Sequence, residues 1–147
     1  MSAIGVVAAR PAFQSGRGGS NPTIALQSLQ VRIVPKRVAA ALIAEHHYLH
    51  TGAAGTHLAF GVFADTKMMG AITLGIGPKN AHRLVDGATP DDVLTLTRLW
   101  LSDDLPRNSE SRVIGIVARL LKKHTSLLFL LSYADPSAGH LGTIYQA

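Results

Sequence analysis

Apolar residues gather in five short runs along this chain, and the first of them alternates with polar residues, as expected for β-strands. The runs cover residues 29–34, 57–64, 68–75, 93–102 and 126–132. The second and third runs are separated by Asp65, Thr66 and Lys67, a spacing typical of a hairpin. The sequence therefore predicts five strands, and the second and third should lie antiparallel to each other.

Two longer segments have the composition of helices. The first follows Pro35, a residue suited to the first helical turn, and continues through Ala, Leu and Ile residues to about His46. The second is capped by Ser109 or Glu110 and runs to about His124. Its predicted apolar face consists of Val113, Ile116, Val117 and Leu120. Basic residues at its carboxyl end, where they complement the helix dipole, are Lys122, Lys123 and His124.

The predicted elements follow the order β-α-β-β-β-α-β-α, with a final helix beginning near His140 or Leu141. Hairpin-connected strands followed by a β-α-β crossover predict an α/β (α+β) fold, in which helices flank a mixed, mainly antiparallel sheet. This order resembles the core of the Gcn5-related N-acyltransferases. Residues 76–92, which carry Gly, Pro, Asn and Asp, predict a long loop with one helical turn at 89–92.

Composition divides the chain into two regions. Residues 1–28 lack a sustained apolar period and indicate a flexible arm, whereas 29–147 form the acyltransferase-like domain. No apolar run approaches the roughly 20 residues of a membrane span, so we expect a soluble protein without a membrane partner. The chain has no cysteine, which excludes disulfides, thiolate metal sites and cysteine nucleophiles and is compatible with a reducing cytoplasm.

The excess positive charge lies near the amino terminus. Before Glu45 there are five basic residues and no acidic one, whereas nine basic and nine acidic residues occur from Glu45 onward. The five are Arg10, Arg17, Arg32, Lys36 and Arg37. A basic arm suits a polyanion such as nucleic acid, because neutralising phosphates releases counterions. A solvated tail and a transit peptide are the alternatives.

The start of the second predicted helix is a candidate phosphate site. A helix amino terminus offers unpaired N–H groups and a positive dipole end, and two nearby arginines add charge. The cofactor-binding candidates are Arg107, Asn108, Ser109, Ser111, Arg112 and Gly115. The spacing of Arg112 and Gly115 resembles the acyl-CoA pyrophosphate loop of Gcn5-related enzymes. An ordinary capped helix is the alternative interpretation.

Histidines cluster where the first predicted helix ends. Residues 45–50 read Glu-His-His-Tyr-Leu-His, so three imidazoles fall within five positions. Neutral imidazole can act as a general base or as a metal ligand near pH 7. The alternative is that histidine serves here as a cation at a helix carboxyl end.

The final segment, residues 132–147, is dense in polar groups and follows the fifth predicted strand. The carboxyl end of a buried strand is where α/β proteins place sites. Asp135, followed by Pro136, cannot continue the strand and presents a carboxylate at the sheet edge, with His140 nearby. The structural alternative is that Asp135 caps a turn and Tyr133 fills the core.

The fourth predicted strand carries an unexpected charge at Arg98. A buried arginine needs an acceptor, and a carboxylate such as Asp135 or a substrate would serve. Trp100 is expected in the core, with stacking on a nucleic-acid base as the alternative.

At these residues the chain resembles the Mom family of bacteriophage DNA-modification proteins, over roughly residues 30–147. The resemblance rests on 96–104 (Leu-Thr-Arg-Leu-Trp-Leu-Ser-Asp-Asp), 106–112 (Pro-Arg-Asn-Ser-Glu-Ser-Arg), 132–136 (Ser-Tyr-Ala-Asp-Pro), 139–147 (Gly-His-Leu-Gly-Thr-Ile-Tyr-Gln-Ala) and the pair His47–Tyr48.

This resemblance implies a Gcn5-related fold and an enzyme of the host-cell cytoplasm. The enzyme would add a carbamoylmethyl group to the N6 amine of adenine in double-stranded phage DNA, which protects the DNA from host restriction. The implied catalytic residues are His47, Tyr48, Ser132 and Asp135, and the implied supporting residues are Tyr133, His140 and Tyr145, with Arg98 beside them. The donor is not identified; an acyl-CoA-like molecule is one candidate, and iron is the metal proposed for the family.

Two departures from the family pattern affect this expectation. Thr95 stands where the family often has an acidic residue. The sequence ends at Ala147, so we expect a fragment or a pocket completed by a partner chain, such as a second copy in a homodimer. A truncated form would leave the fifth strand with an unpaired edge. Two alternatives stay open: an acetyl-CoA-dependent N-acetyltransferase of a small molecule or protein, and a non-catalytic DNA-binding remnant.

Overall fold

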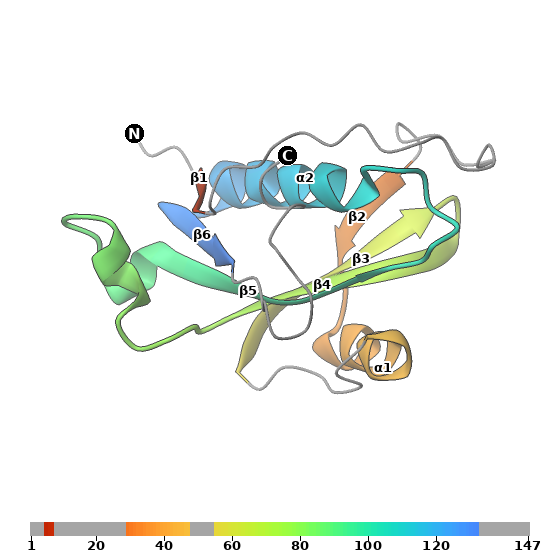
Figure 1. Ribbon diagram of the computed structural model, residues 1–147, viewed down its shortest axis with the longest axis horizontal. Helices are drawn as coiled ribbons and strands as arrows, with labels where there is room; N and C mark the ends of the chain where they lie inside the picture. Colours follow the sequence, from red (N-terminus) through yellow and green to blue (C-terminus); the bar gives the residue numbers. More distant parts are fainter. Residues whose placement is uncertain (1–4, 8–28, 48–54, 133–147) are drawn as a thin grey trace.

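The computed structural model describes residues 5–7, 29–47 and 55–132. In this part of the chain a six-stranded sheet lies between two helices, with α1 on one face and α2 on the other (Figure 1). The helices are α1 (Lys36–His46) and α2 (Ser109–His124). The predicted mixed sheet flanked by helices is therefore confirmed. Within the described ranges, no helix is long and apolar enough to cross a membrane.

The sheet follows the strand order β1-β6-β5-β4-β3-β2. Its strands are β1 (Gly5–Val7), β2 (Leu29–Ile33), β3 (Thr56–Ala64), β4 (Lys67–Gly75), β5 (Val93–Leu101) and β6 (Phe129–Ser132). Neighbours from β2 to β5 pair antiparallel, whereas β6 lies parallel to both β5 and β1. The hairpin between β3 and β4 confirms the turn predicted around Asp65, which adopts the left-handed φ of 53°.

The short strand β1 was not predicted from the sequence. It pairs with β6, so that Gly5 lies opposite Phe129 and Val7 opposite Leu131. The expected unpaired edge on the fifth strand is therefore wrong, because β6 has a neighbour on each side. Three residues are too few for a recognisable period, and their partner lies at the far end of the sequence. The rest of the predicted arm lies outside the described residues, as does the final helix expected near His140.

Helix α1 covers one face of the sheet through small side chains. Pro35, with φ −55°, precedes its first residue, and the N–H of His47 donates to the carbonyl of Ile43 at 2.8 Å where it ends. Ala39 and Ile43 are buried against Ala59 of β3 and Ala71 of β4. Alanine on both sides lets helix and sheet approach closely, so α1 holds a fixed position over the centre of the sheet.

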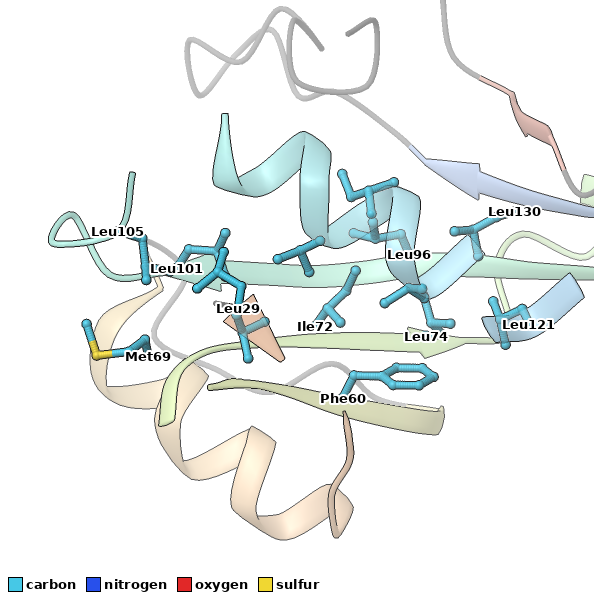
Figure 2. Packing of buried hydrophobic residues seen from close by; sticks show 14 of the residues in the cluster. Leu29, Phe60, Met69, Ile72, Leu74, Leu96, Leu101, Leu105, Leu121 and Leu130 are labelled. Carbon is cyan, nitrogen blue, oxygen red and sulfur yellow. The ribbon is translucent and has the colours of Figure 1, made fainter. Parts of the chain in front are cut away.

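The main core fills the space between α2 and the other face of the sheet (Figure 2). Side chains of β3, β4 and β5 alternate between the two faces, so Phe60, Ile72 and Leu74 point toward α2. Buried residues of α2 are Val113, Ile114, Val117 and Leu121. This corrects the predicted apolar face: Ile116 and Leu120 are only partly buried, because the buried face is centred nearer to Ile114 and Leu121.

The connection between β4 and β5 is long, as predicted, and contains two short 3-10 turns, η2 (Ala81–Leu84) and η3 (Pro90–Asp92). The carboxylate of Asp92 accepts from the N–H and the hydroxyl of Thr89, at 2.6 and 2.9 Å, which fixes the predicted turn. The N–H of Leu128 donates to the carbonyl of Asp92 at 2.8 Å. Strand β6 therefore begins at Phe129, three residues later than predicted.

Two isoleucines provide a direct test of this core. Ile72 is fully buried, whereas Ile76 has 67% of its surface exposed. Ile72→Ala should lower the free energy of unfolding by about 2–5 kcal/mol, because it leaves a cavity under α2. Ile76→Ala should change it by no more than about 0.5 kcal/mol. Urea unfolding of both variants measures the difference, and equal effects would contradict the packing.

Candidate active site

The middle of β5 contains one extra residue relative to β4. Thr73 of β4 lies opposite Arg98 and Leu74 lies opposite Leu96, so Thr97 has no partner of its own in the register with β4. A bulge of this kind bends a strand and changes the direction of its side chains. The bulge therefore bends β5 at the point where its mostly apolar first half meets its polar middle.

Polar side chains from β4 and β5 gather at this bulge, and we call Thr73, Thr95, Thr97 and Arg98 the polar strip. The hydroxyl of Thr97 donates to the carbonyl of Thr73 at 3.0 Å and lies 2.9 Å from the hydroxyl of Thr73. Nη1 of Arg98 donates to the carbonyl of Thr97 at 2.8 Å. Arg98 thus has a backbone acceptor, whereas the predicted acceptor, Asp135, lies outside the described residues.

The polar strip faces the α1 side of the sheet. Ala71 belongs to the cluster under α1, and Thr73 shares its side because successive residues of a strand alternate. Arg98 lies opposite Thr73 and Trp100 lies opposite Ala71. The polar strip and α1 therefore lie on the same face of the sheet.

Thr95 is the least satisfied member of the strip. Its side chain is 5% exposed, and its hydroxyl is buried without a hydrogen-bond partner. Gly77 packs directly over it, since a Cβ at this glycine would lie 2.0 Å from the Thr95 hydroxyl. Buried hydroxyls without partners are uncommon in folded proteins, because their desolvation is not compensated. This hydroxyl is therefore an unused hydrogen-bonding group next to the bulge.

The carboxyl end of α1 reaches β5 through a pair of stacked rings. The His46 ring lies 4.1 Å from Trp100, with an interplanar angle of 13°, and its Nε2 lies 3.5 Å from a carboxylate oxygen of Glu45. Trp100 is half-buried under His46 rather than fully in the core, and its stacking on a nucleic-acid base stays a prediction. His47, the next residue, is buried at the end of the helix.

Ser132 closes β6 beside Leu96 of β5. By register it shares the side of Leu96 and Leu130, which belong to the core under α2. Its hydroxyl is buried and has no hydrogen-bond partner, so it does not bond to His47. The structure thus brings the two predicted catalytic residues to elements that border β5, but it does not join their side chains.

The pairing of β5 with β6 ends at Leu96 and Ser132, whereas β5 continues to Leu101. In the described part of the chain, the last five residues of β5 therefore pair only with β4. Thr95, the first β5 residue of the polar strip, still pairs with Leu131, and Thr97 and Arg98 follow the end of this parallel pairing. The end of β6 and the middle of β5 therefore lie next to each other along the sheet, with Ser132 on the α2 face and the polar strip on the α1 face.

The start of α2 differs from the predicted cap. Asn108 precedes the first helical residue in a left-handed conformation, with φ 66°, and makes no side-chain cap bond. The hydroxyl of Ser109 donates to the carbonyl of Pro106, and this side chain is buried. Ser109 is thus committed to the turn, whereas Arg107 and Arg112 are exposed. The N–H of Ser109 donates to the carbonyl of Pro106 at 3.2 Å and that of Arg112 to the carbonyl of Asn108 at 3.0 Å. The side chains of Arg107 and Arg112 are therefore the groups available to a phosphate.

The other cofactor-binding candidates lie along the same helix. Ser111 and Gly115 are half-buried in the first two turns of α2. A Cβ at Gly115 would approach only Nη1 of Arg119, at 3.5 Å, so this glycine is not required by close packing. The resemblance to a pyrophosphate loop therefore rests on the spacing of Arg112 and Gly115 in the sequence, and not on close packing of the backbone at Gly115.

Metal ligands do not converge in the described ranges. Residues 5–7, 29–47 and 55–132 contain no group of three or more His, Asp or Glu side chains placed to hold a metal ion. The iron expected from the resemblance does not fit the residues described, and we derive no step through a metal. Five of the predicted site residues lie outside these ranges: Tyr48, Tyr133, Asp135, His140 and Tyr145.

Two features of the site were not predicted. The hydroxyl pair of Thr73 and Thr97 depends on the bulge, which local sequence does not reveal. The stack of His46 on Trp100 depends on the angle between α1 and the sheet. The only sequence signal was the occurrence of threonine at 95 and 97 within an apolar strand.

The two β5 threonines give opposite predictions for the same substitution. Thr95→Val replaces an unpaired buried hydroxyl by a methyl group and should raise the free energy of unfolding by about 1 kcal/mol. Thr97→Val removes two recorded interactions with Thr73 and should lower it by about 1–2 kcal/mol. Thermal or urea unfolding checks both signs. A destabilising Thr95→Val would show that this hydroxyl has a partner.

Comparison with solved structures identifies the fold. An aminoglycoside acetyltransferase from an uncultured soil metagenomic sample, in complex with sisomicin, superposes with a TM-score of 0.50 at 8% identity, covering 76% of this chain and 80% of that one. AAC(6')-Iy in complex with the bisubstrate analog CoA-S-monomethyl-acetylneamine gives 0.50 at 14% identity, covering 76% and 82%. The predicted Gcn5-related acyltransferase-like fold is confirmed.

Comparison of sequences identifies the family. The chain is 31% identical over 124 residues to "Methylcarbamoylase mom" of Escherichia phage Mu, which covers 82% of this chain. The chain spans about half the length of this relative, 52%. The profile of the Mom protein family matches residues 28–147, in agreement with the predicted range. The chain belongs to the Mom protein family.

Proposed function

We propose that this chain is a transferase that adds a carbamoylmethyl group to the N6 amine of adenine in phage DNA and so protects the DNA from host restriction. The observation that carries this proposal is the match to the Mom family over residues 28–147, which contain the whole candidate site. The phage Mu relative is named a methylcarbamoylase, which supports transfer of a group that contains a carbamoyl unit.

The geometry of β5 supports a transferase site at the end of its pairing with β6. The polar strip lies on the α1 side, and β5 runs on beyond Leu96 without β6 beside it in the described part of the chain. A base placed here would meet the half-buried side chains of Thr97 and Arg98, whereas Thr73 and Thr95 are buried beneath them. The unpaired hydroxyl of Thr95 provides a further group for hydrogen bonding if Gly77 and its loop move.

The proposed chemistry forms a bond between N6 of adenine and a carbon of the donor. N6 loses a proton in this step, and Asp135 or His47 takes it as the general base. The donor's leaving group keeps the electron pair of the bond that breaks. Tyr48 or Tyr145 orients the donor and Ser132 hydrogen-bonds the substrate. Tyr133 and His140 support these groups.

The start of α2 is the proposed site for phosphates of the donor. Arg107 and Arg112 are exposed beside the first turn of this helix, where the helix dipole favours an anion. The charge of this site suits the phosphates of an acyl-CoA-like molecule. The carbamoylmethyl group would leave such a donor through its methylene carbon, because attack on a thioester carbonyl would give an N6-acyl product instead. Ser109 acts there through the turn that it holds rather than through direct contact.

The target atom lies inside a base-paired duplex, so the enzyme has to extrude the adenine from the helix. Extrusion costs a few kcal/mol, which contacts to the flanking backbone have to offset. Double-stranded DNA is therefore the proposed partner.

Mass spectrometry of nucleosides from co-expressed plasmid DNA tests the proposal. The intact chain should produce an adenine adduct, and Asp135→Asn combined with His47→Gln should abolish it, because neither side chain can then take the proton. Asp103→Asn is the matched control, since this exposed carboxylate precedes α2 and should leave the adduct unchanged. Unmodified adenine with the intact chain would contradict the proposal. Binding of CoA by that chain without binding of DNA would favour an N-acetyltransferase of another substrate.

The donor site is tested separately by calorimetric titration with CoA. Each charge-assisted contact to phosphate contributes about 1.5–3 kcal/mol, so Arg107→Gln with Arg112→Gln should raise the dissociation constant for CoA at least about tenfold. Lys36→Gln with Lys79→Gln removes the same charge from exposed positions elsewhere and should have no effect. Equal binding by both double variants would show that phosphates do not sit at α2.

A further inference from the structure

Basic and acidic residues are equal in number along most of the sequence, but they lie on different elements of the fold. In the described ranges there are twelve Lys and Arg residues and eight Asp and Glu residues. The segment formed by Arg107 and α2 contains five of the basic residues and only one acidic residue, Glu110. The described residues outside this segment include equal numbers of basic and acidic residues. The whole excess positive charge of the described residues therefore lies in the segment formed by Arg107 and α2.

The basic residues of α2 share one face of the helix. At about 100° per residue, Arg112, Arg119 and Lys123 fall within about 40° of each other, and Lys122 lies beside them. All four are exposed, whereas Val113, Val117 and Leu121 form the opposite, buried side. Glu110 is half-buried and lies on that opposite side by the same rotation. We call Arg112, Arg119, Lys122 and Lys123 the basic face of α2.

No described carboxylate neutralises this face. The only ion pair recorded among residues 29–47 and 55–132 is between Glu45 and His46, which lie on α1. Cations near the carboxyl end of a helix interact favourably with the helix dipole, and this interaction explains the presence of Lys122 and Lys123. The dipole gives no reason for Arg119 in the middle of the helix, and Arg112 in the first turn is shared with the proposed donor site. The dipole therefore does not explain the face as a whole.

We propose that the basic face of α2 binds the phosphate backbone of DNA. From Arg112 to Lys123 the face extends about 17 Å along the helix, which corresponds to about five phosphates of one strand. Its position, on the side of the sheet opposite to α1 and the polar strip, makes it a contact separate from the base-binding site (Figure 1). The inference rests on the proposed function in taking DNA as the polyanion, but it does not depend on the chemistry of transfer.

The salt dependence of DNA binding tests this inference. Arg119→Gln, Lys122→Gln and Lys123→Gln are combined in one variant, which leaves the proposed donor arginines intact. Binding of a fluorescein-labelled 20-base-pair duplex is followed by anisotropy between 50 and 200 mM NaCl. Each lost phosphate contact lowers the slope of log K against log salt by about 0.9, so the variant should lose about two to three units of slope.

A matched variant removes three exposed cations from other elements: Lys67→Gln, Lys79→Gln and Arg83→Gln. It has the same net charge as the α2 variant and should keep the slope of the intact chain. Circular dichroism establishes that both variants are folded. Equal slopes for the two variants would overturn the inference, because net charge alone would then explain the effect, and so would an unchanged slope in the α2 variant.

These experiments test DNA binding by the basic face and modification of adenine separately. If the intact chain modifies plasmid adenine while the α2 variant keeps its slope, only the basic-face inference is wrong. If the intact chain leaves adenine unmodified but binds DNA with a slope that depends on α2, the basic face stands and the proposed transfer is wrong.

Discussion

Strand β5 is the constraint on which the rest of the structure depends. On one side it pairs antiparallel with β4, and on the other it pairs parallel with β6. A parallel neighbour requires a crossover, and α2 provides it by packing over the main core. The same strand carries the bulge at Thr97 and supports α1 through Trp100. The candidate site and both helices are thus positioned by one element.

The polar strip shows how the fold accommodates polar groups in a buried strand. Thr73, Thr97 and Arg98 satisfy one another through the bulge, so their burial costs little. Thr95 does not share in this network. A group that costs stability and is nevertheless buried next to a bulge indicates a role in function more than one in folding, since a valine would pack there equally well.

Local sequence was sufficient for most of the fold. The alternation of apolar residues predicted β2, and the polar turn at Asp65 predicted the hairpin, because both depend on neighbouring residues. Pro35 and the histidines placed the limits of α1 correctly. The pairing of Gly5–Val7 with β6 joins distant parts of the sequence, and no local pattern signals such contacts.

The site was less accessible to prediction than the fold. Arg98 was correctly singled out as a charge in an apolar strand. It donates to the carbonyl of Thr97 at a bulge that the sequence does not show, and its pairing with Asp135 stays a prediction. Ser109 was predicted to bind a cofactor, and its hydroxyl instead holds the turn before α2. The basic face of α2 could not be predicted from the sequence, because basic and acidic residues are equal in number from Glu45 onward. Only the structure shows that most of the acidic residues lie on other elements.

The central claim is that adenine binds at β5 where its pairing with β6 ends. Photo-crosslinking of a duplex that carries a single 8-azidoadenine tests it most directly, because the azide reports which residues contact the base. Peptide mapping should locate the crosslink in the tryptic peptide 84–98, which holds Thr95 and Thr97. A crosslink confined to β2 and β3, at the far edge of the sheet, would contradict this placement.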